Sequence, residues 1–303
     1  MVWLSPLVTY SQTVEIFERI GQRVVARSSI WKQAQVEGER LHQAVLKQQQ
    51  RVGVERVKLP AAGLDHRQPK GIGMDGGMVN IRGEGWKEMK VGAVYEVETR
   101  LERDPQTSEL VERAHGVEVG YTAVLGSPDA FAPALWALAV QRRVPEAAES
   151  CVTSDGATWI WNLVADLFPD SVQIVDWFHA CQHLDTAAKA LFPDDPLAAS
   201  RWFCQHQTSL FQGQLQTIID PLQQAGLPEL AHYFQTHQRR MQYQEFSEHP
   251  YPIGSGCVES GVKQFKARLT GPGMRWSRLN AERMLTLRSA VLSHSFDQLW
   301  LAA

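Results

Sequence analysis

Three carboxylates in this sequence stand in three different local settings. Asp75 lies in GIGMDGGMVNI, Asp155 lies in CVTSDGATWIW, and Glu259 lies in PIGSGCVESGVKQFKARL. Both aspartates follow an apolar stretch and precede a glycine, whereas the glutamate begins a segment rich in lysine and arginine. A two-metal phosphoryl-transfer site needs acidic oxygens from separate elements beside a surface that can bind DNA. The pattern therefore indicates a site for divalent ions.

Each of these carboxylates also has a structural explanation that needs no metal. An Asp-Gly pair such as Asp75–Gly76 is common in turns, and taken alone it favours a turn. Asp155 precedes a predicted helix and could cap its N-terminus. Glu259 stands in the first turn of a predicted helix, where the helix dipole favours a negative charge. The segment GIGMDG also fits a dinucleotide-binding pattern, but a strand is predicted where that site requires a helix, so we discount it.

A further acidic residue, Asp176, forms a DxxH pair with His179 in VDWFHA. Both side chains are expected near the end of one strand, where they could orient a phosphate or a water molecule. Asp176 therefore competes with Asp155 to be the second acidic ligand. We favour Asp155, because the fourth predicted strand ends there.

Basic residues are concentrated after the third carboxylate. The net charge of the whole chain is only −3, so composition alone does not indicate a nucleic-acid partner. We predict that five basic side chains bind the DNA backbone, namely Lys263, Lys266, Arg268, Arg275 and Arg278. Trp276 lies among them and is a candidate for stacking on a flipped or frayed base. A solvated helix face is the alternative explanation of the same charges.

Histidines and cysteines near the DxxH pair could be interpreted as a zinc site formed by His179, Cys181, His183 and Cys257. Their spacing matches no recognised zinc finger, so buried cysteines and hydrogen-bonded histidines are the favoured explanation. Three tryptophans, Trp159, Trp161 and Trp177, are interpreted as core aromatics.

The elements that must position these residues follow from local patterns. Three strand-like segments come first, IGMDGGMVNIR, KVGAVYEVETR and VEVGYTAVLG. A helix (AFAPALWALAVQRR), a short strand ending at Asp155, a second helix (TWIWNLVADLF) and a strand ending near Asp176 follow. This order is that of a ribonuclease H-like fold, an α/β class in which helices flank a mixed sheet.

The predicted fold divides the chain into five parts. Residues 71–183 form the first part of a catalytic core, and residues 250–303 form its C-terminal helical part. Between them, residues 184–249 contain no strand-like run and are predicted to be an all-helical insertion. Residues 1–52 are predicted to be helical, and residues 53–70, with their prolines, are predicted to be a linker.

The N-terminal segment is predicted to contain two helices. Apolar residues at helical spacing mark a first face at Val14, Phe17, Ile20 and Val24 and a second at Trp31, Ala34, Leu41 and Val45. Ser28 and Ser29 are candidate caps for the second helix, and Gly38 weakens its prediction. The pair could be part of a helix-turn-helix or a dimerisation hairpin.

The cysteines contain no CxxC pair, no signal peptide is visible, and no apolar run is long enough to span a bilayer. We therefore expect a soluble protein in a reducing interior, cytoplasmic and associated with the nucleoid, with no membrane partner.

Several motifs occur together in the order of one known family. The segments DGGMVNIRGEGWKEMKVGAVYEVE, SDGATWIWNLV, VDWFHACQHL and PIGSGCVESGVKQFKARLTGPGMRWS, followed by AERMLTLRS, resemble bacterial insertion-sequence transposases of the ISKra type. These are DDE transposases allied to the Mutator-like group. The resemblance covers the chain from about residue 71 to about residue 293 and is loose in the N-terminal segment.

The resemblance implies that Asp75, Asp155 and Glu259 are catalytic and hold two Mg²⁺ or Mn²⁺ ions. It also matches Asp176 and His179 to the family's C/D-x-x-H motif, as supporting residues. The implied activity is DNA strand cleavage and strand transfer at element ends. The implied partners are terminal inverted repeats, target DNA and a second copy of the protein.

Two alternatives stay open. The first is a ribonuclease H-like nuclease or resolvase, which cuts without joining. The second is a truncated, DNA-binding remnant without catalysis, because family members usually carry more chain before the N-terminal segment.

Overall fold

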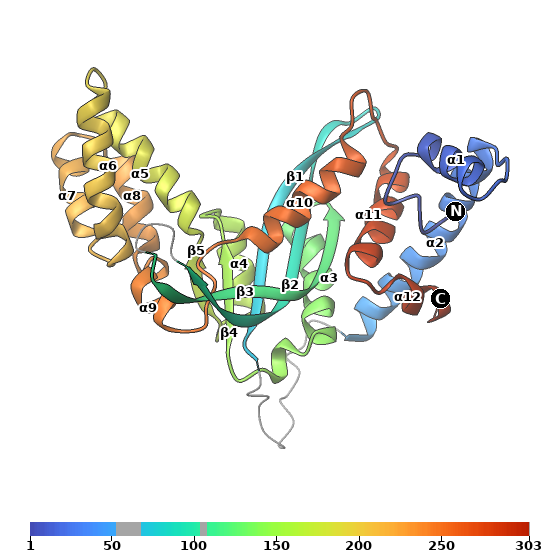
Figure 1. Ribbon diagram of the computed structural model, residues 1–303, viewed down its shortest axis with the longest axis horizontal. Helices are drawn as coiled ribbons and strands as arrows, with labels where there is room; N and C mark the ends of the chain where they lie inside the picture. Colours follow the sequence, from blue (N-terminus) through green and yellow to red (C-terminus); the bar gives the residue numbers. More distant parts are fainter. Residues whose placement is uncertain (53–67, 104–107, 303) are drawn as a thin grey trace.

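A mixed five-stranded sheet forms the centre of the computed structural model, which describes residues 1–52, 68–103 and 108–302 (Figure 1). The strands lie in the order β3-β2-β1-β4-β5. Their bounds are β1 (Lys70–Ile81), β2 (Gly85–Arg103), β3 (Leu110–Leu125), β4 (Ser150–Ser154) and β5 (Val172–Val175). The first three strands pair antiparallel, and β1, β4 and β5 pair parallel. The predicted ribonuclease H-like α/β class is confirmed. Most of the predicted linker, residues 53–67, lies outside the described residues.

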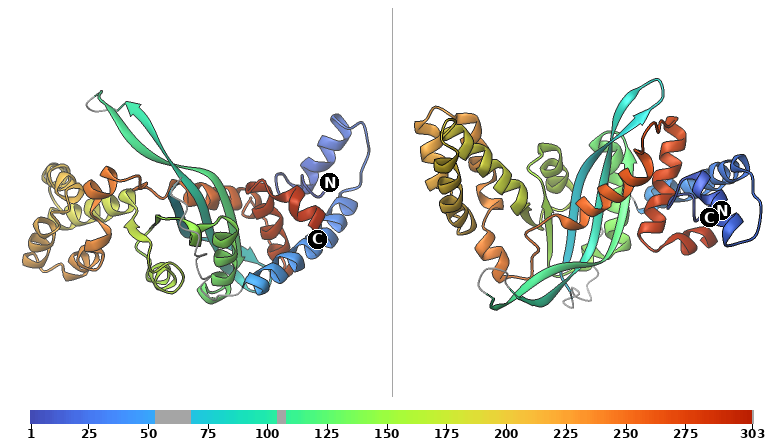
Figure 2. Two further views of the ribbon diagram at one scale, coloured as in Figure 1. Left: turned by 90° about the horizontal axis from the view of Figure 1, so that it is seen from below. Right: turned by 45° about the horizontal axis from the view of Figure 1, so that its top comes forward.

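The strand sequences explain this arrangement. β4 (SCVTS) is short and almost entirely buried, and β5 (VQIV) is short and largely apolar, as strands covered on both faces usually are. The tight connection between β1 and β2 contains Gly83 and Gly85, whose φ angles of +77° and +75° favour glycine. Beyond an irregularity in pairing between Val94 and Glu96, the outer parts of β2 and β3 continue as a two-stranded ribbon that extends past the sheet (Figure 2).

Side chains alternate across β1 and separate two hydrophobic cores. Ile72 and Met74 point into the first core, which includes residues of α3 (Pro128–Gln141) and α4 (Thr158–Leu167). Val79 and Ile81 point into the second core, together with residues of α10 (Gly256–Leu269) and α11 (Arg278–Leu292). The odd-numbered positions of β1, including position 75, therefore face α10.

The chain between β5 and α10 is helical. It contains α5 (Trp177–Leu191), α6 (Pro196–Phe211), α7 (Gln216–Gln224), α8 (Pro228–His237), the short 3₁₀ helix η2 (Gln238–Arg240) and α9 (Tyr243–Glu248). Most of these helices form a lobe that projects to one side of the sheet (Figure 1). Apolar side chains of α7 and α8 join the first core, so the lobe packs continuously with the sheet.

The two ends of the chain lie together on the opposite side, where α1 (Tyr10–Arg19), α2 (Arg27–Val52) and α12 (Phe296–Ala302) pack near α11 (Figures 1 and 2). A second 3₁₀ helix, η1 (Val144–Glu146), precedes β4. In the described part of the chain no helix is both long enough and apolar enough to cross a membrane.

Three details of the N-terminal prediction are wrong. The first helix ends at Arg19, and Ile20 and Val24 lie beyond it with 80% and 90% of their surface exposed. Ser28 and Ser29 lie inside α2 and do not cap it. Gly38 is not a weak point, because a Cβ atom there would lie 3.2 Å from the Cβ atom of Arg283. The glycine lets α2 and α11 approach closely, which compensates for its low helix propensity.

Candidate active site

Asp75 lies in the middle of β1 and not in a turn. It is paired with Val91 of β2, so the interpretation of its Asp-Gly pair as a turn is wrong. A Cβ atom at Gly73 would lie 3.0 Å from Val258, and one at Gly77 would lie 3.2 Å from the Cε atom of Lys266. Helix α10 therefore crosses β1 at close range on the face that carries Asp75.

Asp155 follows β4 directly and lies near Asp75, whose pKa its charge raises. The parallel pairing of β1 with β4 runs from Lys70 to Ile72, and beyond it the Met74 amide donates a hydrogen bond of 2.9 Å to Ser154 Oγ. Asp155 Oδ1 accepts a hydrogen bond of 2.9 Å from the Ala157 amide, which closes a turn before α4. Because the N-cap residue of α4 is Ala157, Asp155 does not cap that helix.

The charges around Asp75 oppose one another. Burial raises the pKa of the Asp75 carboxyl, and the Asp155 carboxylate raises it further. The Gly76 amide, which donates a hydrogen bond of 2.6 Å, and the positive charges of His179 and Lys266 pull this pKa back down. The net effect is a raised pKa. A bound divalent cation would relieve the repulsion between the two aspartates, which is the usual electrostatic setting of such an ion.

Asp176 is fully buried and connects two helix starts. Its Oδ1 accepts hydrogen bonds from the amide of His179 at 2.8 Å and from His179 Nδ1 at 3.1 Å, at the start of α5. Its Oδ2 accepts a hydrogen bond from the Ser255 amide, at the start of α10. Burial raises the pKa of Asp176, but these hydrogen bonds outweigh burial and leave the pKa lowered. The hydrogen bond with Asp176 raises the pKa of His179.

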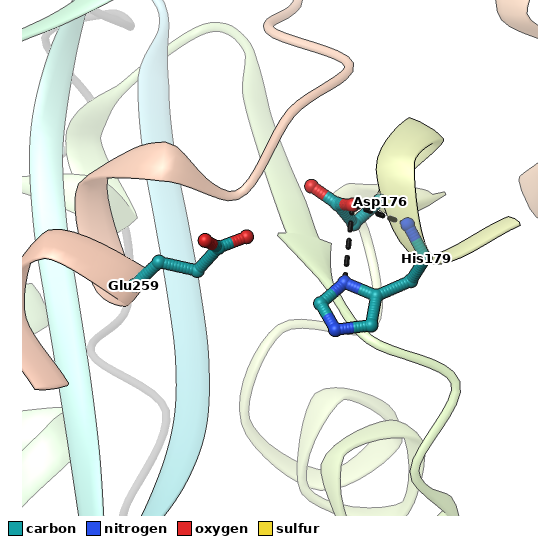
Figure 3. A group of neighbouring side chains, drawn as sticks. All are labelled: Asp176, His179 and Glu259. Carbon is teal, nitrogen blue, oxygen red and sulfur yellow. Dashed lines mark hydrogen bonds and ion pairs between the residues drawn. The ribbon is translucent and has the colours of Figure 1, made fainter. Parts of the chain in front are cut away.

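Glu259 extends from α10 toward Asp176 and His179 (Figure 3). Its Oε1 accepts a hydrogen bond of 3.0 Å from Ser255 Oγ, and its Oε2 lies 3.6 Å from Lys263 Nζ. One ligand atom each from Asp176, His179 and Glu259 lie within 4.8 Å of one another, so this group could hold a metal ion.

Among the described residues, the group with this geometry includes neither Asp75 nor Asp155. Those two carboxylates lie close enough for the charge of Asp155 to raise the pKa of Asp75. Both oxygens of Asp176 already accept hydrogen bonds from protein donors, and one of these bonds fixes the start of the helix that carries Glu259. We therefore give Asp176 a positioning role and keep Asp75 and Asp155 as the preferred ligands.

Three of the predicted DNA-binding residues present their charges to solvent. Lys263 has 78% of its side chain exposed, and Lys266 and Arg275 are also exposed. The exposed guanidinium of Arg278 is engaged by Glu84, because its Nε donates to Glu84 Oε1 at 3.1 Å. Both exposed lysines lie on α10; Lys263 pairs with Glu259, and Lys266 lies close enough to Asp75 to lower its pKa.

Two predicted DNA contacts are wrong. Arg268 is 3% exposed, and its Nε donates a hydrogen bond of 2.6 Å to the Ser5 carbonyl. Trp276 is 9% exposed, and its indole N–H donates to the Leu269 carbonyl at 2.9 Å. The guanidinium of Arg268 also lies over the ring of Trp276. Both side chains therefore hold α10 within the fold, and neither faces a ligand.

The suggested zinc set does not form a metal site. The ring of His183 stacks on Tyr233 at 3.6 Å between centroids, and Cys181 Sγ accepts from Gln207 at 3.6 Å. Among the described residues, the group with metal-ligand geometry contains neither cysteine. The alternative prediction, that these histidines and cysteines contact other protein groups and bind no metal, is the better description.

Two features of the site were missed in the sequence. Phe178, between Asp176 and His179, is 66% exposed, which is unusual for a phenylalanine. The sequence DWFH shows that Phe178 is adjacent to these residues. Its exposure follows only from the start of α5 at Trp177. The second feature is a contact between α8 and Gly156, described below; no local pattern predicts it, because α8 is far from β4 in the sequence.

Comparisons with known proteins add little to this geometry. The sequence matches no known protein family and no curated protein. Among solved structures, the chain is similar to one described as the Drosophila P element transposase strand transfer complex, at a TM-score of 0.26 and 12% identity. That similarity covers 98% of this chain and 85% of the other chain. So loose a similarity says nothing about the activity of this chain.

Proposed function

We propose that this protein is a metal-dependent enzyme of DNA phosphoryl transfer, and specifically a DDE transposase. The observation that carries the proposal is that three carboxylates come from three elements that pack together. Asp155 follows β4, which pairs with β1, and its charge acts on the pKa of Asp75. Glu259 lies on α10, which crosses the face of β1 that carries Asp75. Carboxylate oxygens from separate elements are the ligands that Mg²⁺ and Mn²⁺ prefer.

The residues of the proposed site have different roles. When bound, a pair of divalent ions supplies activation of the attacking hydroxyl and stabilisation of the leaving oxygen. Asp75, Asp155 and Glu259 hold the ions in place. Asp176 fixes the starts of α5 and α10, and so sets where His179 and Glu259 point. His179 carries its raised pKa at the edge of the site, where a protonated ring can hold a phosphate oxygen.

The proposed substrate is DNA because exposed cations lie along the helix that carries Glu259. Lys263 and Lys266 follow it on α10, and Arg275 lies in the connection to α11. These three side chains would bind phosphates without reading bases. The proposal of an ISKra-type transposase adds strand transfer, element ends, target DNA and a second protomer, and it is supported by the run of sequence motifs from about residue 71 onward.

Three variants test this proposal, Asp75→Asn, Asp155→Asn and Glu259→Gln, each of which removes one metal-binding charge at nearly constant volume. The substrates are duplexes made from the DNA that flanks the reading frame. Each variant should fold, bind DNA and lose Mg²⁺-dependent cleavage by orders of magnitude, because metal stabilisation contributes several kcal/mol. Cleavage by Glu259→Gln at the parent rate would refute the assignment.

A second assay separates transposition from plain cutting. The parent protein receives a duplex whose 3′ end is already cut, together with a target plasmid. Joined products support a transposase. Cleavage of the uncut duplex without any joining of the pre-cut end would leave a nuclease or resolvase.

A further inference from the structure

The turn that carries Asp155 contacts two rings of α8. A Cβ atom at Gly156 would lie 2.7 Å from Cε2 of Tyr233 and 3.2 Å from Nε2 of His237. Both residues belong to the helical lobe and not to the sheet. Gly156 does not have a positive φ angle, so glycine is needed here for space rather than for backbone conformation.

The orientation of the His237 ring is set from its other side. Arg240 can only donate hydrogen bonds, so His237 Nδ1, at 3.3 Å from Arg240 Nη1, is an acceptor. The proton of the neutral ring therefore sits on Nε2. The Nε2 side of the His237 ring faces Gly156, and the Gly156 backbone raises the pKa of the ring, as a carbonyl facing the Nε2–H does.

Arg240 is itself fixed on the sheet. Its Nε donates a hydrogen bond of 2.8 Å to Gln173 Oε1 on β5, and its guanidinium lies 4.4 Å from the ring centroid of Trp161 on α4. A continuous chain of contacts thus runs from β5 through Arg240 and His237 to the turn after β4. Tyr233 contacts the same turn at Gly156 and stacks on His183 of α5.

We propose that His237 is a positioning residue for Asp155, and that α8 of the helical lobe holds the acidic turn in its metal-binding geometry. This inference rests on the proposed function, in which Asp155 is a metal ligand. A turn after a short strand is free to shift unless its backbone groups are held, and groups that orient a ligand commonly change metal affinity about 10–100-fold when removed. The lobe would then be part of the catalytic site and not an appendage.

The test compares the Mn²⁺ affinities of His237→Leu and His237→Gln, measured by titration calorimetry. Thermal unfolding of both variants is measured in parallel. Leucine removes the donor to Gly156, whereas the glutamine amide can donate to Gly156 and accept from Arg240. We expect His237→Leu to weaken Mn²⁺ binding by about 10-fold or more and His237→Gln to recover part of the loss. Equal Mn²⁺ affinity in the parent and His237→Leu would overturn the proposal.

The matched control is His206→Leu. His206 is also a buried histidine of the lobe, but its Nδ1 bonds to the Trp202 carbonyl of its own helix. It should lower thermal stability without changing Mn²⁺ affinity. If both leucine variants lose Mn²⁺ binding alike, His237 has only a structural role and the proposal fails.

A second series works even if His237→Leu does not fold. Gly156→Ala presses a methyl group against Tyr233, and Tyr233→Ala removes the ring that it meets. We expect Gly156→Ala to weaken Mn²⁺ binding and the double variant to recover part of it. Unchanged affinity in Gly156→Ala would contradict the positioning role. If the parent itself binds no Mn²⁺, the proposed function fails instead, and the two failures are distinguished.

Discussion

Single residues in this protein act through groups that they fix in place. Asp176 is the clearest case, because one buried carboxylate receives hydrogen bonds from the starts of two helices that are far apart in the sequence. Its DxxH spacing is visible in the sequence, but its contact with Ser255 is not. Phe178 and His237 show the same dependence on neighbours, since their roles follow from where α5 and α8 place them.

Phe178 is expected to stack on an unpaired base near the acidic cluster. Phe178→Ala should weaken binding of single-stranded or frayed DNA ends by about 1–3 kcal/mol, the usual contribution of one base–aromatic stack. Fluorescence anisotropy with labelled oligonucleotides measures this change. Leu197→Ala is the control, since Leu197 is also an exposed apolar residue, at the start of α6. Equal losses in the two variants would contradict a specific stack.

The titration of His237 should contribute to the acid sensitivity of the fold. Burial, and then the charge of Arg240, lower the pKa of His237 to about 4, whereas in the unfolded chain this pKa is near the ordinary histidine value of 6.5. The unfolded state therefore binds the proton first, and stability falls as pH drops from about 6.5 toward 4. His237→Gln should show a shallower loss in urea unfolding over this range. The same pH dependence in parent and variant would contradict a buried neutral ring.

At the scale of elements, the site depends on how closely α10 approaches β1. Gly73 and Gly77 have no side chains, so Val258 and Lys266 pack directly against the β1 backbone on either side of Asp75. The position of Glu259 follows from this packing, because Val258 precedes it directly. Glycines in a strand usually weaken it, and here they mark the close passage of a helix.

Gly73→Ala should therefore act on both the fold and the site. Its methyl group would lie 3.0 Å from Val258, and such overpacking typically costs about 1–3 kcal/mol. Denaturant unfolding should show the loss of stability, and the shift of α10 should weaken Mn²⁺ binding. Gly126→Ala is the control, because its Cβ atom would make only an ordinary contact of 3.4 Å with Ala130. Parent-like metal binding in Gly73→Ala would contradict the link between α10 packing and Glu259.

At the scale of the whole molecule, charge and burial must be separated before DNA contacts can be assigned. Arg268 and Lys263 lie on the same helix and were indistinguishable in the sequence, yet one is in the interior and the other is in solvent. The interior is created by the N-terminal segment, whose Ser5 carbonyl and Tyr10 ring cover Arg268.

The two residues should give opposite phenotypes. Arg268→Ala leaves the buried Ser5 carbonyl without its donor and should lower the free energy of unfolding by about 1–3 kcal/mol or more. Lys263→Ala should leave stability unchanged. It should make the slope of log binding constant against log salt concentration shallower by about one unit. Unfolding curves and salt titrations measure the two effects. An unchanged slope in Lys263→Ala would mean that Lys263 is a solvated charge on the helix surface and does not contact DNA.

The sequence predicted the order of strands and helices because each strand has a local apolar pattern and each boundary has glycine or charge. It also predicted that Asp155 follows a strand, since SCVTSD ends in a turn before a helix. It could not predict which basic residues are buried, where α8 meets Gly156, or that α10 crosses the face of β1 that carries Asp75. These facts depend on contacts between segments that are distant in the chain, and local patterns do not encode such contacts.

The central claim, that Asp75, Asp155 and Glu259 hold the metal ions, is tested most directly by a crystal structure of the protein soaked in Mn²⁺, with anomalous scattering to locate the ions. We expect two peaks about 3.5–4 Å apart, bound by oxygens of Asp75, Asp155 and Glu259, with Asp176 still hydrogen-bonded to His179 and Ser255. A peak bound by Asp176, His179 and Glu259, with Asp155 turned away from it, would show that Asp75 and Asp155 are not the ligands.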